Sequence, residues 1–144
     1  MPNILVFDEK GNPLDPIIID IPRIKPSDSF KKEVVNWILM VPTLKDWKDI
    51  KILFPKLVPA FRNFMVKNNK IIGQTYEKQN SLTKFFIYDL GKKTYKTVYL
   101  PTAEREMVGF SKNKIYAFTG THYYYLVDND ENETWELWET EFHL

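Results

Sequence analysis

Short runs of apolar residues alternate with polar residues along most of this chain, and this period of two predicts β-strands. Three segments share one arrangement, in which an apolar run ends in Asp and a polar or glycine-containing turn leads to a second apolar run. Each segment therefore predicts a β-hairpin. The paired runs are residues 4–8 with 17–19, residues 85–89 with 95–101, and residues 124–128 with 135–138.

A matching pair of short strands precedes each of the last two hairpins. The predicted strands are residues 64–66 and 70–72 before one hairpin, and residues 108–110 and 114–116 before the other. Four strands thus recur at a spacing of about 40 residues, if residues 77–83 form a surface loop that shortens to residues 120–122 in the last repeat. We predict a half repeat at residues 1–22 and full four-stranded repeats at residues 62–101 and 102–144.

A helical period follows the first hairpin. Residues 26–39 carry apolar side chains at helical spacing, and Ser27 or Asp28 is placed to cap the first turn. We predict one amphipathic helix that ends before Pro42, with an apolar face formed by Phe30, Val34, Trp37, Ile38 and Val41. Residues 51–61 include two prolines, which disfavour a central strand, so residues 26–61 should comprise the helix and an extended lead-in to the sheet.

These elements predict an all-β fold of antiparallel four-stranded, propeller-type blades with one inserted amphipathic helix, in a single module. The order of FDEKG, the helix, FPKLVPAF, NNKIIGQTY, FFIYDLGKK and VYLP resembles bacterial six-bladed β-propeller proteins of the NHL/TolB-like type. The resemblance implies blades around a channel, with ligands or partners bound at the rim. The chain is similar to the C-terminal portion of such a protein, with about two and a half blades.

An incomplete ring leaves apolar blade faces open, and the strand at residues 3–7 lacks the inner strand that would pair with its free edge. Such surfaces are covered by a partner. We therefore expect self-association, with an isologous dimer as the commonest arrangement.

The amino-acid composition argues against several classes of function, among them nucleic-acid binding, membrane spanning and thiolate chemistry. A chain of 144 residues that is 44% hydrophobic is able to bury a core. Its 20 basic and 19 acidic residues nearly balance, so no strong field attracts nucleic acid, and no apolar run approaches the roughly 20 residues of a membrane span. Having no cysteine excludes disulfides and thiolate chemistry. The sequence begins without an export signal, whereas the resemblance implies an extracytoplasmic location if the chain belongs to an exported propeller.

The acidic segment after the third apolar run has the ligand spacing of a calcium loop. Asp128, Asp130, Asn132, Glu136 and Glu139 stand at relative positions 1, 3, 5, 9 and 12. However, position 6 is Glu133 where such loops carry glycine, and the strand pattern of residues 135–142 would point Glu139 away. A solvated hairpin turn is the alternative that we favour.

Two arginines occupy similar places, because Arg62 and Arg105 each lie just before a predicted inner strand. Guanidinium groups repeated around a propeller rim could bind a carboxylate or phosphate of a small anionic ligand. The alternative is local ion pairing, since Arg105 stands between Glu104 and Glu106.

Other candidates favour structural roles. His122 and His143 lack partners at a motif spacing, so we expect a turn position for His122 and exposure near the chain end for His143. The aromatic residues could form a stacking platform, but packing between blades is the simpler interpretation. They are Tyr123, Tyr124, Tyr125, Trp135 and Trp138.

The sequence contains no phosphate loop, nucleophile elbow or zinc motif. We therefore expect a non-enzymatic binding or interaction module that needs no cofactor and takes a small anionic ligand or a protein partner. Two alternatives stay open: a fragment of a propeller hydrolase or lyase whose catalytic residues lie in absent blades, and a calcium-stabilised structural domain.

Overall fold

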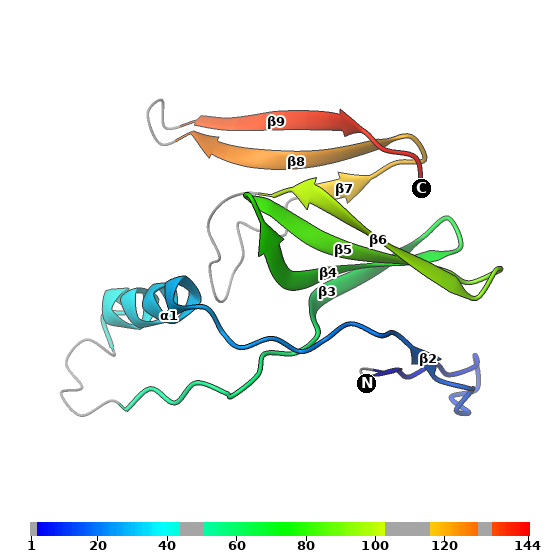
Figure 1. The fold of residues 1–144 in the computed structure, drawn as a ribbon, viewed down its shortest axis with the longest axis horizontal. Coiled ribbons are helices and arrows are strands. Elements are labelled where there is room, and N and C mark those ends of the chain that lie inside the picture. Colours follow the sequence, from blue (N-terminus) through cyan, green and yellow to red (C-terminus); the bar gives the residue numbers. More distant parts are fainter. Residues whose placement is uncertain (1–2, 44–50, 103–115, 130–133) are drawn as a thin grey trace.

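The computed structural model describes residues 3–43, 51–102, 116–129 and 134–144 of the chain (Figure 1). Within these residues one helix and nine strands form, and the strands make antiparallel sheets of two, four and three strands. The predicted mainly β, antiparallel fold with one helix is therefore confirmed. The strands are β1 (Asn3–Ile4), β2 (Ile17–Ile18), β3 (Phe61–Lys67), β4 (Lys70–Gln79), β5 (Leu82–Asp89), β6 (Thr94–Pro101), β7 (Tyr116–Phe118), β8 (His122–Asn129) and β9 (Thr134–Glu141).

All three predicted hairpins are present. They are formed by β1 with β2, β5 with β6, and β8 with β9, and each later sheet follows the order of the chain as a meander. The second predicted strand pair is described only in part, because residues 108–110 lie outside the described residues. Among the described strands, β1 pairs with β2 alone.

Two-residue turns connect β3 to β4 and β4 to β5 in the four-stranded sheet. Asn68 and Asn69 join β3 to β4 with φ angles of 48° and 57°, and Asn80 and Ser81 join β4 to β5 with 48° and 65°. Two successive left-handed residues match the right-handed twist of a hairpin, and Asn tolerates this conformation better than most residues.

The second of these turns corrects one prediction. Residues 77–83 are not a surface loop, because Lys78 pairs with Thr83 and Gln79 pairs with Leu82. The strands continue almost to the turn, and an irregularity between Gln74 and Lys78 bends β4. Two of the polar side chains that suggested a loop are instead hydrogen-bonded to neighbouring strands and their ends, Glu77 to Lys84 and Tyr99, and Thr83 to Thr102.

Asp8 and Asp89 shape the turns of the first two predicted hairpins. The Asp8 carboxylate accepts hydrogen bonds from the amides of Lys10 and Asn12 (2.9 and 2.8 Å), and the Asp89 carboxylate accepts from those of Gly91 and Lys92 (3.0 and 2.9 Å). Further hydrogen bonds, from the Asn12 side chain to Asp8 and from the Lys70 ammonium to Asp89, complete each turn. Because these bonds favour the ionised form, the pKa of each carboxyl lies below its ordinary value.

Helix α1 (Asp28–Met40) occurs where the apolar period predicts it. The Ser27 hydroxyl caps its first turn by accepting a hydrogen bond of 3.1 Å from the Phe30 amide. Phe30, Val34 and Ile38 are half-buried on the predicted apolar face, whereas no residue of the helix is fully buried. The described helix is too short to span a bilayer.

The segment before helix α1 is hydrogen-bonded to the segment before β3. Residues 51–60 form no regular strand, as predicted, and the Val58 amide donates to the Ile24 carbonyl at 2.8 Å. The Arg23 guanidinium donates to the carbonyls of Leu57 and Val58, both at 3.2 Å. These bonds fix the segments that precede the helix and β3 beside each other.

The four-stranded sheet is the middle layer of three. One face packs against the three-stranded sheet, and the shared cluster contains Ile72, Phe85, Ile87, Leu100, Phe118 and Tyr123. The opposite face packs against the N-terminal hairpin and its continuation through Ile19, Ile21, Ala60, Ile71 and Phe86. Figure 1 shows this stacking, with the N-terminal hairpin below the middle sheet and β8 and β9 above it. Successive residues of β5 therefore pack alternately on the three-stranded sheet and on the N-terminal hairpin.

Candidate functional site

A concave site lies where β4 bends, between the middle sheet and the start of α1. We call it the Tyr76 pocket. Its volume is about 410 Å³, which lies in the range of small-molecule sites. It is lined by Ile24, Pro26, Ser27, Ser29, Phe30, Val58, Tyr76, Glu77 and Lys78.

Aromatic rings form one wall of the Tyr76 pocket. Phe30, from the first turn of α1, meets Tyr76 of β4 edge to face, with 6.1 Å between ring centroids. The guanidinium carbon of Arg62 lies 5.0 Å from the centroid of the Tyr76 ring. This cation–π contact and the Phe30 edge together fix the Tyr76 ring.

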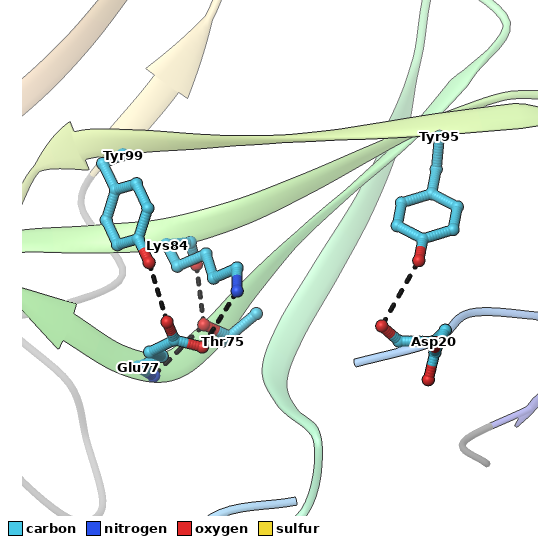
Figure 2. A network of polar contacts seen from close by, with 6 residues as sticks. All are labelled: Asp20, Thr75, Glu77, Lys84, Tyr95 and Tyr99. Atoms are coloured by element: carbon cyan, nitrogen blue, oxygen red, sulfur yellow. Dashed lines mark hydrogen bonds and ion pairs between the residues drawn. The ribbon is translucent and has the colours of Figure 1, made fainter. Parts of the chain in front are cut away.

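A bonded carboxylate forms the polar wall. Glu77 accepts hydrogen bonds from the Tyr99 hydroxyl (2.7 Å) and the Lys84 ammonium (3.0 Å), as Figure 2 shows. The Thr75 hydroxyl accepts from the Glu77 amide at 3.1 Å and donates to the Lys84 carbonyl at 2.9 Å. Three strands, β4, β5 and β6, thereby fix one carboxylate at the bend.

These bonds set the charge state of the carboxylate. The Tyr99 hydroxyl and then the Lys84 ammonium lower the pKa of Glu77, so the group is ionised at neutral pH. The same hydrogen bond raises the pKa of Tyr99, which keeps its proton. The pocket therefore presents a fixed anionic acceptor beside an aromatic surface.

The other polar groups come from the helix start and the strand end. The hydroxyls of Ser27 and Ser29 lie 3.0 Å apart, and the Ser27 oxygen also caps α1. Lys78 follows Glu77 on β4 and lines the same pocket. The remaining lining is apolar, so the site combines an apolar interior with a few oriented polar groups.

Arg62 is the one predicted anion-binding residue whose surroundings the structure describes. It is the second residue of β3, and its guanidinium lies on the Tyr76 ring next to the pocket. Arg105 lies outside the described residues. The paired arginine site at a rim thus stays a prediction.

The calcium hypothesis falls mostly on undescribed positions, since Asp130 and Asn132 lie outside the described residues and only the backbone of Asp128 is placed, at the end of β8. Glu136 and Glu139 lie on β9, where their odd spacing directs them to opposite faces. Within the described part of the chain, no three His, Cys, Asp or Glu side chains gather as a metal site would require.

The two histidines have neighbours that their spacing did not reveal. His122 begins β8, and its Nδ1 lies 2.9 Å from the Thr121 hydroxyl. His143 is exposed, and its Nε2 lies 2.8 Å from the Glu141 carboxylate. Each makes a local pair with a near neighbour in sequence.

The C-terminal aromatics divide between the two faces of their sheet. Tyr123 is fully buried against Phe85 and Phe118, and Tyr125 packs on the same cluster. Their role in packing between sheets agrees with the simpler interpretation above. Tyr124 points to the opposite face, and Trp135 and Trp138 stay partly exposed.

Sequence reasoning did not find the Tyr76 pocket. Its walls come from residues 24–30, 58 and 76–78, which the fold brings together from three segments. The alternation of Thr75, Glu77 and, on β5, Lys84 was the available signal, because it places polar side chains on one sheet face.

Comparison with known proteins adds no family to this description. No protein-family model, curated protein or solved structure matches the chain. The resemblance to NHL/TolB-like propellers therefore stays a prediction.

Proposed function

We propose that this chain is a binding module of propeller-type blades that holds a small organic ligand in the Tyr76 pocket. The observation that carries the proposal is the pocket itself. An aromatic wall, an apolar floor and one fixed carboxylate converge there from α1, the lead-in segment and the bend of β4.

Three stacked antiparallel sheets support the propeller-type architecture. Each sheet follows the order of the chain, and the middle sheet has a neighbour on each face, as a blade within a propeller has. On this proposal β3 is the innermost strand of its blade, and Arg62 and the adjoining pocket lie near the blade end.

The lining indicates the class of ligand. A flat apolar group suits the space beside Phe30, Val58 and Tyr76, since aromatic and aliphatic walls favour such groups. The Glu77 carboxylate accepts hydrogen bonds and cannot donate them while ionised. We therefore expect a flat ligand with a hydroxyl or amine donor, in preference to an anion.

A titration with three matched probes tests this proposal. 2-Naphthol carries the flat body and the donor, 2-methoxynaphthalene lacks the donor, and naphthalene-2-sulfonate replaces it with an anion. The amide resonances of Phe30, Val58 and Tyr76 report binding by NMR. For 2-naphthol we expect a dissociation constant on the order of 0.1–1 mM, since ligands of this size gain only a fraction of a kcal/mol per atom.

Matched variants localise the site. Ser29→Trp should fill the pocket from the exposed first turn of α1 and abolish the shifts, whereas Lys32→Trp, on the same helix but outside the pocket lining, should retain them. Absence of shifts at these amides, or equal binding by the two variants, would refute the pocket. Tighter binding of the sulfonate would refute the ligand class.

A further inference from the structure

Among the residues that the structure describes, none covers the outer apolar face of either outermost sheet. On the N-terminal hairpin, Leu5, Phe7 and Ile18 point away from the middle sheet and are 70%, 56% and 56% exposed. We call these residues the N-face. On the three-stranded sheet, Tyr124, Leu126 and Leu137 point away from the middle sheet, and Leu137 is 67% exposed. We call these residues the C-face.

The three hairpins are compared by counting positions back from Asp8, Asp89 and Asp128, the residues that end their first apolar runs. The comparison shows that residues equivalent to the N-face and the C-face are packed in other sheets of the chain. In the middle sheet, the residues one and three places before Asp89 are Tyr88 and Phe86, which pack towards the N-terminal hairpin. The residues at the same places before Asp128 are Val127 and Tyr125; Tyr125 packs on the middle sheet, which is the layer before its own. Before Asp8, these two places hold Phe7 and Leu5 of the N-face.

The residues between these positions point to the other face of each sheet, which in the middle sheet lies towards the layer that follows it in the chain. Two and four places before Asp89 lie Ile87 and Phe85, which are 2% and 0% exposed against the three-stranded sheet. Two and four places before Asp128 lie Leu126 and Tyr124, which form the C-face. The N-face and C-face are thus the two halves of a contact that the chain already makes between its successive sheets.

We propose that the N-face of one copy of this chain docks on the C-face of a second copy. The occupant of each face is then the same protein, because the side chains of each face repeat the pattern that packs on the other within the chain. Such a contact is heterologous, so it joins copies head to tail and closes into a ring where the rotation per copy permits. This arrangement differs from the isologous dimer expected from the sequence.

The proposal rests on the equivalence of the three sheets and does not depend on the Tyr76 pocket. The two ideas therefore fail separately. Loss of 2-naphthol binding would leave the face contact untouched, and a monomeric chain would leave the pocket untouched.

Mixing two variants tests head-to-tail docking. Light scattering coupled to size exclusion should show the unaltered 144-residue chain as a dimer or larger species at about 100 μM, a concentration suited to moderate interfaces. Leu5→Glu destroys only the N-face and Leu137→Glu only the C-face, so each variant alone should be a monomer. An equimolar mixture retains one intact face of each kind and should form a 1:1 heterodimer that grows no further.

The control is Leu53→Glu, an equally drastic change at a position that is 78% exposed and belongs to neither face, which should leave the assembly intact. A monomeric unaltered chain overturns the proposal. So does a single variant that still dimerises, because an isologous contact would survive the loss of the other face. Circular dichroism of each variant verifies that these exposed changes leave the fold in place.

A chemical cross-link gives an independent reading. The natural chain has no cysteine, so Leu5→Cys and Leu137→Cys each introduce a unique thiol. A bismaleimide of about 10 Å matches the spacing of packed sheets. Head-to-tail docking should give a mixed L5C–L137C product in at least tenfold excess over either homodimer, and a preference for homodimers would overturn it.

Discussion

The hydroxyl of Tyr123 on β8 donates a hydrogen bond of 2.8 Å to the carbonyl of Pro101, the last residue of β6. The bond joins the middle sheet to the three-stranded sheet at the point where the Tyr123 ring is fully buried. It therefore fixes one sheet relative to the next in addition to the apolar packing between them.

Tyr123→Phe should lower the free energy of unfolding by about 1–2 kcal/mol, because the Pro101 carbonyl loses its partner while the ring remains. Urea denaturation followed by tryptophan fluorescence measures this loss. Tyr88→Phe is the matched control, since the Tyr88 hydroxyl makes no hydrogen bond within the described residues, and it should change stability by less than about 0.5 kcal/mol. Equal effects of the two changes would contradict a structural role for the bond.

Gly73→Ala should be strongly destabilising. The Phe86 ring covers Gly73 on the neighbouring strand so closely that a Cβ there would lie 2.0 Å from Phe86 Cε1. Phe86 is fully buried and cannot move aside without disturbing its cluster, so we expect a loss of about 2–3 kcal/mol in thermal or urea unfolding.

Gly91→Ala is the control for that change, because its nearest neighbour is the flexible Asn69 side chain at 3.3 Å. Its effect should be below about 1 kcal/mol. If both alanine variants were equally stable, the close packing of Phe86 on Gly73 would be disproved.

Glu77→Gln should remove a stabilising effect that depends on pH. Because the folded pKa of Glu77 lies below its ordinary 4.5, its contribution is complete above that value and disappears as the pH falls through the lower folded pKa. We expect the variant to be about 1 kcal/mol less stable at pH 7 and the difference to shrink towards zero in strong acid.

Thermal unfolding at a series of pH values measures this convergence. A difference for Glu77→Gln that is constant from pH 7 to pH 2 would show that its carboxylate is not specifically stabilised by Tyr99 and Lys84.

Ser81→Gly should stabilise the protein. Ser81 has a φ of 65°, a left-handed conformation that disfavours residues with a Cβ, and an Asn-Gly turn is preferred between two strands. We expect an increase of about 0.5–1 kcal/mol, measured as a higher melting temperature. Ser81→Ala should not stabilise, and equal melting temperatures for the two variants would argue against strain in this turn.

The sequence predicts much of the fold because its local signals agree with the packing. The apolar runs ending in Asp8, Asp89 and Asp128 mark three hairpins, and Ser27 with Phe30 marks the start of α1. Residues 77–83 misled the prediction because polar residues usually indicate a loop. Here Glu77, Lys84 and Tyr99 satisfy one another on a sheet face, so a polar segment continues as strand.

The site was less predictable than the fold for a physical reason. The Tyr76 pocket depends on the bend in β4 and on the hydrogen bonds from Arg23 to Leu57 and Val58, which hold the segments before α1 and before β3 beside each other. Neither feature has a periodic signature, because each arises from contacts between segments far apart in sequence.

The middle position of the four-stranded sheet determines how the molecule should open. Its central strands β4 and β5 have hydrogen-bonded neighbours on both edges and apolar layers on both faces, whereas within the described parts of the chain β1 and β2 pair only with each other and pack on one layer. Amide protons of β4 and β5 should therefore exchange with solvent only through global unfolding, and those of β1 and β2 through local unfolding of low free energy. Slow exchange in the N-terminal hairpin at high protein concentration, lost on dilution, would show that docking of a second copy extends this protection to the end of the stack.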